Sequence, residues 1–234
     1  MRSPYRLTRR SLLVAAPGAL ALSGLALSVK DSAAADETSA PADRAPASPP
    51  AQAGTVGATD PRLAPRIIGN PNAKVLVQEW FSLTCTHCAH FALTEFPQVK
   101  KDFIDTGKIR FQFNDFPMDG AGLLGAMVAR SLPENRYLPF IDALFSHQVK
   151  WLFSGGDPVA YLEKIAALAG VSKAQFDAIR NDKAYAEALY NQAHQAEEKY
   201  HIEGTPYFRF NNLALPQDPG NITKFAEMVK KAAS

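Results

Sequence analysis

Short stretches of the chain carry the patterns of apolar and polar side chains that strands require. Residues 75–81 are a β-prone run that follows a turn signal at residues 70–72. Ile109, Phe111 and Phe113 alternate with polar residues, which is the period of a half-buried strand. Both segments are therefore predicted to be strands.

Most of the remaining chain carries apolar residues at helical spacing. Phe91, Phe96 and Val99 predict a helix between the two strands. Pro97 is expected to bend this helix, because proline removes a backbone donor. From residue 122 to about residue 200 almost every window favours helix. A long all-helical stretch is therefore expected after the second strand.

The end of the chain returns to β structure and closes with a helix. Residues 207–210 are β-prone, residues 211–212 signal a turn, and a further strand begins at Leu213. Asn221 is expected to cap the last helix. This order of elements predicts an α/β fold, in which a small mixed sheet is interrupted by an inserted all-helical domain at about residues 118–200.

The first 35 residues have the features of an export signal. Four arginines within residues 2–10 precede an apolar run at residues 12–29, and alanines at residues 33–35 offer a cleavage site. We therefore expect residues 1–35 to direct export, with cleavage after Ala35.

Two features of this signal leave the route and the cleavage open. The paired arginines at residues 9–10 fit a twin-arginine signal, although adjacent arginines also occur in general secretory signals. An uncleaved membrane anchor is the alternative to cleavage. Pro17, Gly18 and Gly24 weaken it, because they interrupt a run that is already short for a membrane span.

Residues 36–65 have the composition of a linker. Of these 30 residues 14 are Ala or Pro, and none is aromatic. Such a segment cannot bury enough apolar surface to offset its ordering entropy, so we expect an extended or disordered tether. Residues 66–234 are long enough for one domain with a sizeable core.

Composition and charge exclude several classes of protein. With 47% hydrophobic and 21% charged residues, the chain is typical of soluble globular proteins. Residues 36–234 carry 20 basic and 22 acidic side chains, which argues against nucleic-acid binding. Two cysteines are too few for a disulfide-stapled scaffold.

The strongest chemical signal is Cys85-Thr86-His87-Cys88, which follows the first predicted strand and opens the next helix. Two cysteines at this spacing can close a disulfide across one helical turn. The unpaired N–H groups and the dipole of the helix would stabilise a Cys85 thiolate. His87 can add positive charge or a hydrogen bond toward that sulfur. A disulfide whose reduced form is stabilised in this way is a strong oxidant.

The cysteine pair has three alternative uses. A structural disulfide across so short a loop gives only about 2 kcal/mol of stability. Zinc needs about four ligands, and the five histidines include no second close-spaced pair of the H-x₃₋₅-H kind. Covalent haem attachment requires C-x-x-C-H, whereas Ala89 follows Cys88. Redox activity is therefore the favoured interpretation, with a structural bridge and a metal site as alternatives.

A second signal is Gly204-Thr205-Pro206, immediately before the strand predicted at residues 207–210. A proline that opens a strand is tolerated there. A cis Thr205–Pro206 bond would expose the preceding backbone for pairing with an extended peptide. The motif is weak by itself and becomes specific in combination with the cysteine pair.

With both motifs in view, the chain resembles the DsbA-type thiol–disulfide oxidoreductases. The resemblance rests on residues 79–91, on residues 204–206 and on the helical insertion between them, and it spans residues 66–234. It implies a thioredoxin fold, location in the bacterial periplasm and oxidation of cysteines in newly exported proteins. It also implies no bound cofactor and reoxidation by a quinone-linked membrane partner of the DsbB type. We expect a monomer.

The same resemblance assigns roles to individual residues. Cys85 would be the exposed thiol that forms a mixed disulfide with substrate, and Cys88 its buried partner. Pro206 would be a cis-proline that faces the disulfide, and Thr205 would offer its backbone to the substrate.

The resemblance also covers the residues between and beneath the cysteines. His87 matches the family histidine, while Thr86 replaces the usual proline and is grouped with the substrate-binding residues. Glu79 matches an acid beneath the active site that can relay protons to the buried thiol, and burial would raise its pKa. The alternative is that Glu79 marks a solvated strand face.

Two further residues lie near the motifs. His90, one turn beyond His87, is expected to face solvent. Met118 fits either a substrate groove or core packing.

Two rival functions follow from the same residues. Thr205 before the proline also fits a disulfide isomerase or reductase. No oligomerisation segment is apparent, which favours an oxidase over these two activities. A chaperone-like module that binds unfolded chains, with incidental cysteines, is the second rival.

Overall fold

The structure, a computed structural model, describes residues 60–234. The predicted export signal at residues 1–35 and the part of the predicted linker at residues 36–59 lie outside the described residues.

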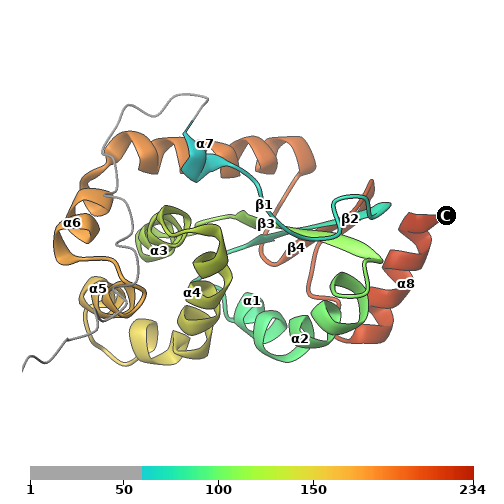
Figure 1. The fold of residues 1–234 in the computed structure, drawn as a ribbon, viewed down its shortest axis with the longest axis horizontal. Coiled ribbons are helices and arrows are strands. Elements are labelled where there is room, and N and C mark those ends of the chain that lie inside the picture. Colours follow the sequence, from blue (N-terminus) through green and yellow to red (C-terminus); the bar gives the residue numbers. More distant parts are fainter. Residues whose placement is uncertain (1–59) are drawn as a thin grey trace, which may run out of the picture. The chain divides into compact units, whose positions relative to one another are not determined.

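A five-stranded mixed sheet organises the described region (Figure 1). The strands lie in the order β1-β3-β2-β4-β5, with β2 parallel to β3 and the other neighbours antiparallel. Their bounds are β1 (Arg66–Gly69), β2 (Val75–Phe81), β3 (Ile109–Asp115), β4 (Tyr207–Phe210) and β5 (Leu213–Leu215). This confirms the predicted small mixed sheet.

The strand β1 is missing from the sequence prediction. It has only four residues and pairs along one side with β3, so that Ile67 lies opposite Gln112. Ile67 is also 44% exposed, so this strand lacks a strong burial pattern. Pairing with β3, distant in sequence, makes this segment a strand.

One continuous helical segment follows β2, and it changes hydrogen-bond register along its length. It consists of α1 (Thr86–His90), the π-helical η2 (Phe91–Glu95), α2 (Phe96–Val99) and the π-helical η3 (Lys100–Ile104). Pro97, expected to bend the helix, lies in the first turn of α2, where η2 ends. Proline has no N–H to donate to the preceding turn, and the change from π-helical to α-helical hydrogen bonding occurs beside it, so the helical segment continues past Pro97 with a change of register.

A set of helices lies between β3 and β4, as predicted. They are α3 (Gly120–Ser131), α4 (Glu134–Ser146), the π-helical η4 (Val149–Phe153), α5 (Pro158–Leu168), α6 (Lys173–Asn181) and α7 (Lys183–Tyr200). The chain ends with α8 (Ile222–Ala233), and the Asn221 side chain caps it by accepting a hydrogen bond from the Lys224 N–H at 2.9 Å. In Figure 1, α1, α2 and α8 lie along one side of the sheet and α7 along the other.

Aromatic side chains fix the first helical segment to the sheet. The Phe91 ring contacts Phe208 of β4 with 4.8 Å between centroids, and Phe96 contacts Phe111 of β3 at 5.2 Å. Phe225 of α8 contacts Phe210 at 5.0 Å. Edge-to-face aromatic pairs at these distances add to the energy of burial. The position of α1 at the end of β2 therefore rests on packing contributed by both halves of the sheet.

The last residues of the predicted linker contact the domain. Arg62, in the 3₁₀ turn η1 (Pro61–Leu63), pairs with Asp60 at 2.7 Å and with Asp182 at 3.0 Å. Its guanidinium also lies 3.8 Å from the centre of the Tyr185 ring. Asp182 and Tyr185 are about 120 residues away in the sequence, so the linker composition gives no sign of these contacts.

A buried ion pair joins the insertion to the sheet. Arg130 of α3, which is 4% exposed, pairs with the Asp115 carboxylate at the end of β3, and the Tyr137 hydroxyl donates to the same carboxylate at 3.2 Å. Arg130 also donates to the main-chain carbonyls of Arg62 and Ala64, at 3.2 and 3.0 Å. This network holds three separate segments together.

No helix within residues 60–234 combines the length and the apolar character that a membrane crossing requires.

We expect Arg130→Ala to lower the free energy of unfolding by about 3–5 kcal/mol, because it leaves the buried Asp115 carboxylate without its partner. Equilibrium unfolding in urea measures the change. Arg136→Ala is the matched control, because the exposed Arg136 guanidinium makes one hydrogen bond, to the Ala169 carbonyl at 3.0 Å. The free energy of unfolding should fall by less than about 1 kcal/mol in Arg136→Ala. Equal losses in the two variants would contradict a structural role for the buried pair.

Candidate active site

The predicted site forms where β2 gives way to α1. Cys85 precedes the first residue of α1 and has an extended backbone, with φ −82° and ψ 124°. A residue in this position presents its side chain to the unpaired N–H groups of the first helical turn. The strand-to-helix junction therefore places one sulfur at the positive end of a helix.

The surroundings of the Cys85 sulfur favour its thiolate. They lower its pKa from 9.0 to about 5, and the largest cause is a hydrogen bond from the Cys88 thiol. Burial opposes the shift, while the Thr205 side chain and the backbone N–H groups of Cys88 and His87 add to it. In its protonated form the thiol donates to the Thr205 carbonyl at 3.2 Å. Cys85 is therefore ionised near neutral pH.

Cys88 has the opposite character. Its side chain is 0% exposed, and both cysteines are free thiols in this structure. Burial first, and then the hydrogen bond to Cys85 and the charge of Glu79, raise the pKa of Cys88. Two thiols three positions apart thus differ strongly in acidity, one partly accessible and the other enclosed.

The second sequence motif meets the first in space. The Thr205–Pro206 peptide bond is cis, and the Thr205 carbonyl lies at the Cys85 sulfur although 120 residues separate them. The Thr205 hydroxyl contacts the Met118 sulfur at 3.3 Å. Met118 is 60% exposed, which excludes core packing and leaves it on the surface beside Thr205.

Glu79 lies in the central strand β2, between Phe113 of β3 and Phe208 of β4. It is 4% exposed, so a solvated strand face is excluded. Burial first, and then the charges of Asp218 and Cys85, raise the pKa of Glu79 well above its ordinary value. The carboxyl is therefore a buried acid beneath the cysteine pair.

Thr86 and His87 occupy the first turn of α1, and both are exposed. His87 reaches the Cys85 sulfur through its backbone N–H. His90 is exposed, as expected, and its imidazole lies 3.4 Å from the Asp218 carboxylate.

One contact at the site comes from a residue that the sequence does not single out. Gln148, which precedes η4 and is 4% exposed, donates to the carbonyls of Leu83 at 2.9 Å and of Cys85 at 3.0 Å. A glutamine inside a helical stretch carries no motif, so only the tertiary structure reveals this role. Gln148 joins the insertion to the loop that carries the reactive sulfur.

The sequence is similar to that of known thioredoxin-family proteins. Residues 62–230 match the thioredoxin family. A Rickettsia typhi protein that is named as a protein-disulfide oxidoreductase is 31% identical over 148 residues, which are 63% of this chain and 54% of the relative. The chain thus spans about half the length of the curated relatives that it matches.

Solved structures extend the comparison to the fold. The crystal structure of α-DsbA1 from Wolbachia pipientis matches with a TM-score of 0.64 and 28% identity, over 73% of this chain and 92% of that chain. Oxidised BdbD from Bacillus subtilis matches with a TM-score of 0.59 over 72% of this chain and 92% of that chain. The sequence identity to BdbD is 20%, so this match concerns the fold alone.

We expect Glu79→Gln to raise the free energy of unfolding of the reduced protein at pH 7, because the glutamine amide does not ionise whereas the buried Glu79 carboxyl has a raised pKa. In the unfolded chain this carboxyl ionises at about pH 4.3, whereas the folded protein keeps it protonated to higher pH. The wild type therefore loses stability as the pH rises above about 4, and the variant is spared this loss.

Urea unfolding at pH 4 and pH 7 measures the effect, and the stability gain should be larger at pH 7. Glu203→Gln, at an exposed position, is the control and should show no such pH dependence. A gain independent of pH would contradict the raised pKa of Glu79.

Proposed function

The chain belongs to the thioredoxin family, and we propose that it is a DsbA-type thiol–disulfide oxidoreductase that introduces disulfides into exported proteins. The Cys85 sulfur carries this proposal. Its hydrogen bonds from the Cys88 thiol and from the N-terminus of α1 lower its pKa to about 5. Stabilising the reduced form in this way drives a Cys85–Cys88 disulfide to accept electrons.

The proposed reaction starts from the disulfide form. A substrate thiolate attacks the Cys85 sulfur, the Cys85–Cys88 bond breaks, and the Cys88 sulfur leaves and takes up a proton. A second substrate thiolate then attacks the substrate sulfur of the mixed disulfide, and Cys85 leaves as a thiolate. The substrate loses two electrons and gains a disulfide, and the cysteine pair is reduced. The low pKa of Cys85 favours its departure in the second step.

The surrounding residues are assigned supporting roles. Thr205, before cis-Pro206, would pair its backbone with an extended substrate beside the Cys85 sulfur. The exposed Thr86 would contribute to the same substrate surface. His87 would stabilise the thiolate, and Glu79 would exchange protons with the buried thiol.

We place the protein in the periplasm. The basic and apolar pattern of residues 1–35 supports export, with cleavage after Ala35 and residues 36–65 as the linker to the domain at 66–234. Its substrates would be reduced or unfolded exported proteins. Each turnover leaves two electrons on the cysteine pair, so an electron acceptor is required, and a quinone-linked membrane protein of the DsbB type would fill this role without a cofactor bound to this chain.

The pH dependence of Cys85 reactivity is the first test. Alkylation of the reduced protein by iodoacetamide should show a midpoint near pH 5, against about 8.5 for an ordinary cysteine. Cys88→Ala should raise the midpoint, because the Cys88 thiol supplies the largest stabilising hydrogen bond. Cys88→Ser should raise it less, since a hydroxyl can still donate. A wild-type midpoint near 8.5 would remove the driving force on which the proposed oxidase depends.

The direction of electron flow is the second test. Equilibration with glutathione buffers should give a reduction potential of about −120 mV for an oxidase. A value of about −270 mV is typical of a reductant and would overturn the proposed direction. The protein should also oxidise a reduced two-cysteine peptide, and Cys85→Ala with Cys88→Ala should abolish this activity. If this double variant retained the activity of the protein in cells, the chaperone alternative would be supported instead.

A further inference from the structure

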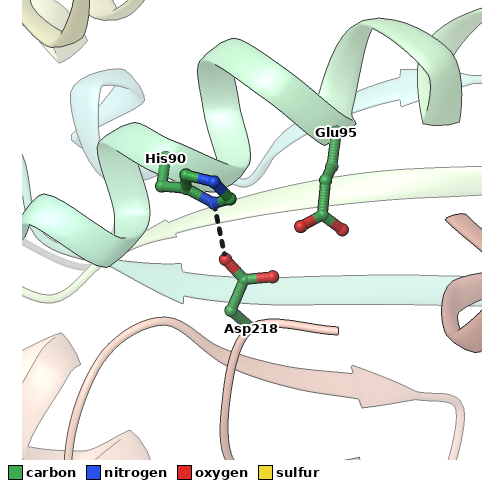
Figure 2. Close-up of side chains that lie close together, drawn as sticks. All are labelled: His90, Glu95 and Asp218. Carbon is green, nitrogen blue, oxygen red and sulfur yellow. Dashed lines mark hydrogen bonds and ion pairs between the residues drawn. The ribbon is translucent and has the colours of Figure 1, made fainter. Parts of the chain in front are cut away.

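A second cluster of chemically active side chains lies just beyond the cysteine pair. His90 ends α1, Glu95 ends η2, and Asp218 lies in the loop between β5 and α8. Each offers a ligand atom, and these atoms lie within 4.8 Å of one another. Figure 2 shows the three side chains converging from the active-site helix and from this loop.

Glu95 is the unusual member of the cluster. It is 8% exposed, and both of its carboxylate oxygens are buried without a hydrogen-bond partner. Its carboxylate points toward His90 and Asp218 in Figure 2. A buried carboxylate needs either a proton or a counter-charge.

The π-helical turn brings two of the three residues together. In an ordinary α-helix, residues five positions apart point about 140° away from each other. In a π-helix the hydrogen bonds join residue i to i+5, so such residues lie nearly one above the other. The Phe96 N–H donates to the Phe91 carbonyl in this register. The local backbone thus turns His90 and Glu95 toward the same side.

We propose that His90, Glu95 and Asp218 bind a zinc ion. One imidazole nitrogen with two carboxylate oxygens is a donor set that suits zinc, and three protein ligands leave a fourth position for water. The histidine disfavours calcium and magnesium, which prefer oxygen ligands throughout. The ion would supply the counter-charge for Glu95 and would link the active-site helix to the loop that carries Asp218. This site does not depend on the proposed thiol chemistry.

Titration calorimetry with zinc chloride tests the proposal on the full chain in its disulfide form, in which Cys85 and Cys88 cannot act as ligands. A second preparation carrying Cys85→Ala and Cys88→Ala serves the same purpose. We expect one equivalent of zinc to bind. His90→Ala, Glu95→Gln and Asp218→Asn should each weaken binding by more than about tenfold.

The matched control is His194→Ala. His194 also lies beside two carboxylates, Glu197 at 3.1 Å and Glu198 at 3.6 Å, but on the exposed surface of α7. This control should bind zinc as the wild type does. Absence of binding, or binding that persists in Glu95→Gln or weakens equally in His194→Ala, would overturn the proposal. Calcium binding that does not require His90 would also overturn it.

Chemical modification keeps the proposal testable if a variant fails to fold. Diethyl pyrocarbonate should modify the exposed His90 of the wild type, and zinc should protect it, as read by peptide mass spectrometry. His194 should stay unprotected. Equal modification of His90 with and without zinc would show that zinc does not bind at His90 and would overturn the proposal.

Discussion

The difference in acidity between two neighbouring thiols is the property on which the site depends. The Cys85 sulfur receives hydrogen bonds from the Cys88 thiol and from the backbone at the start of α1, and its pKa falls to about 5. Cys88 lies inside the core, and its pKa rises. The donors to Cys85 include Cys88 itself, so the two shifts are coupled. A pair of this kind holds one sulfur ready to exchange and keeps the other enclosed.

The register between β2 and β4 brings the Thr205-Pro206 motif to the cysteine pair. Trp80 of β2 lies opposite Tyr207 of β4, so Pro206 comes beside the end of β2, just before the loop that carries Cys85. The helical insertion then reaches the same loop through Gln148, whose amide holds the carbonyls of Leu83 and Cys85. Three segments that are distant along the chain therefore converge on one sulfur.

Much of the fold and part of the site could be predicted from local signals. Residues 75–81 and 109–114 carry strand patterns, and Asn221 caps α8 as expected. Cys85 and Cys88 stand out because their spacing at a strand-to-helix junction is itself chemical information. By contrast, β1 became a strand only through its pairing with β3, and Gln148 has no signature outside its contacts.

The sequence by itself determined the order of elements from β2 onward, the cysteine pair and the Thr205-Pro206 motif, because these rest on periodicity and spacing within a few residues. Only the tertiary structure decided which distant groups meet. It brought Thr205 to Cys85, buried Glu79 beneath them and turned Glu95 toward His90 and Asp218. The physical reason is that burial and hydrogen-bond partners, which set the acidity of these groups, come from segments about 120 residues apart.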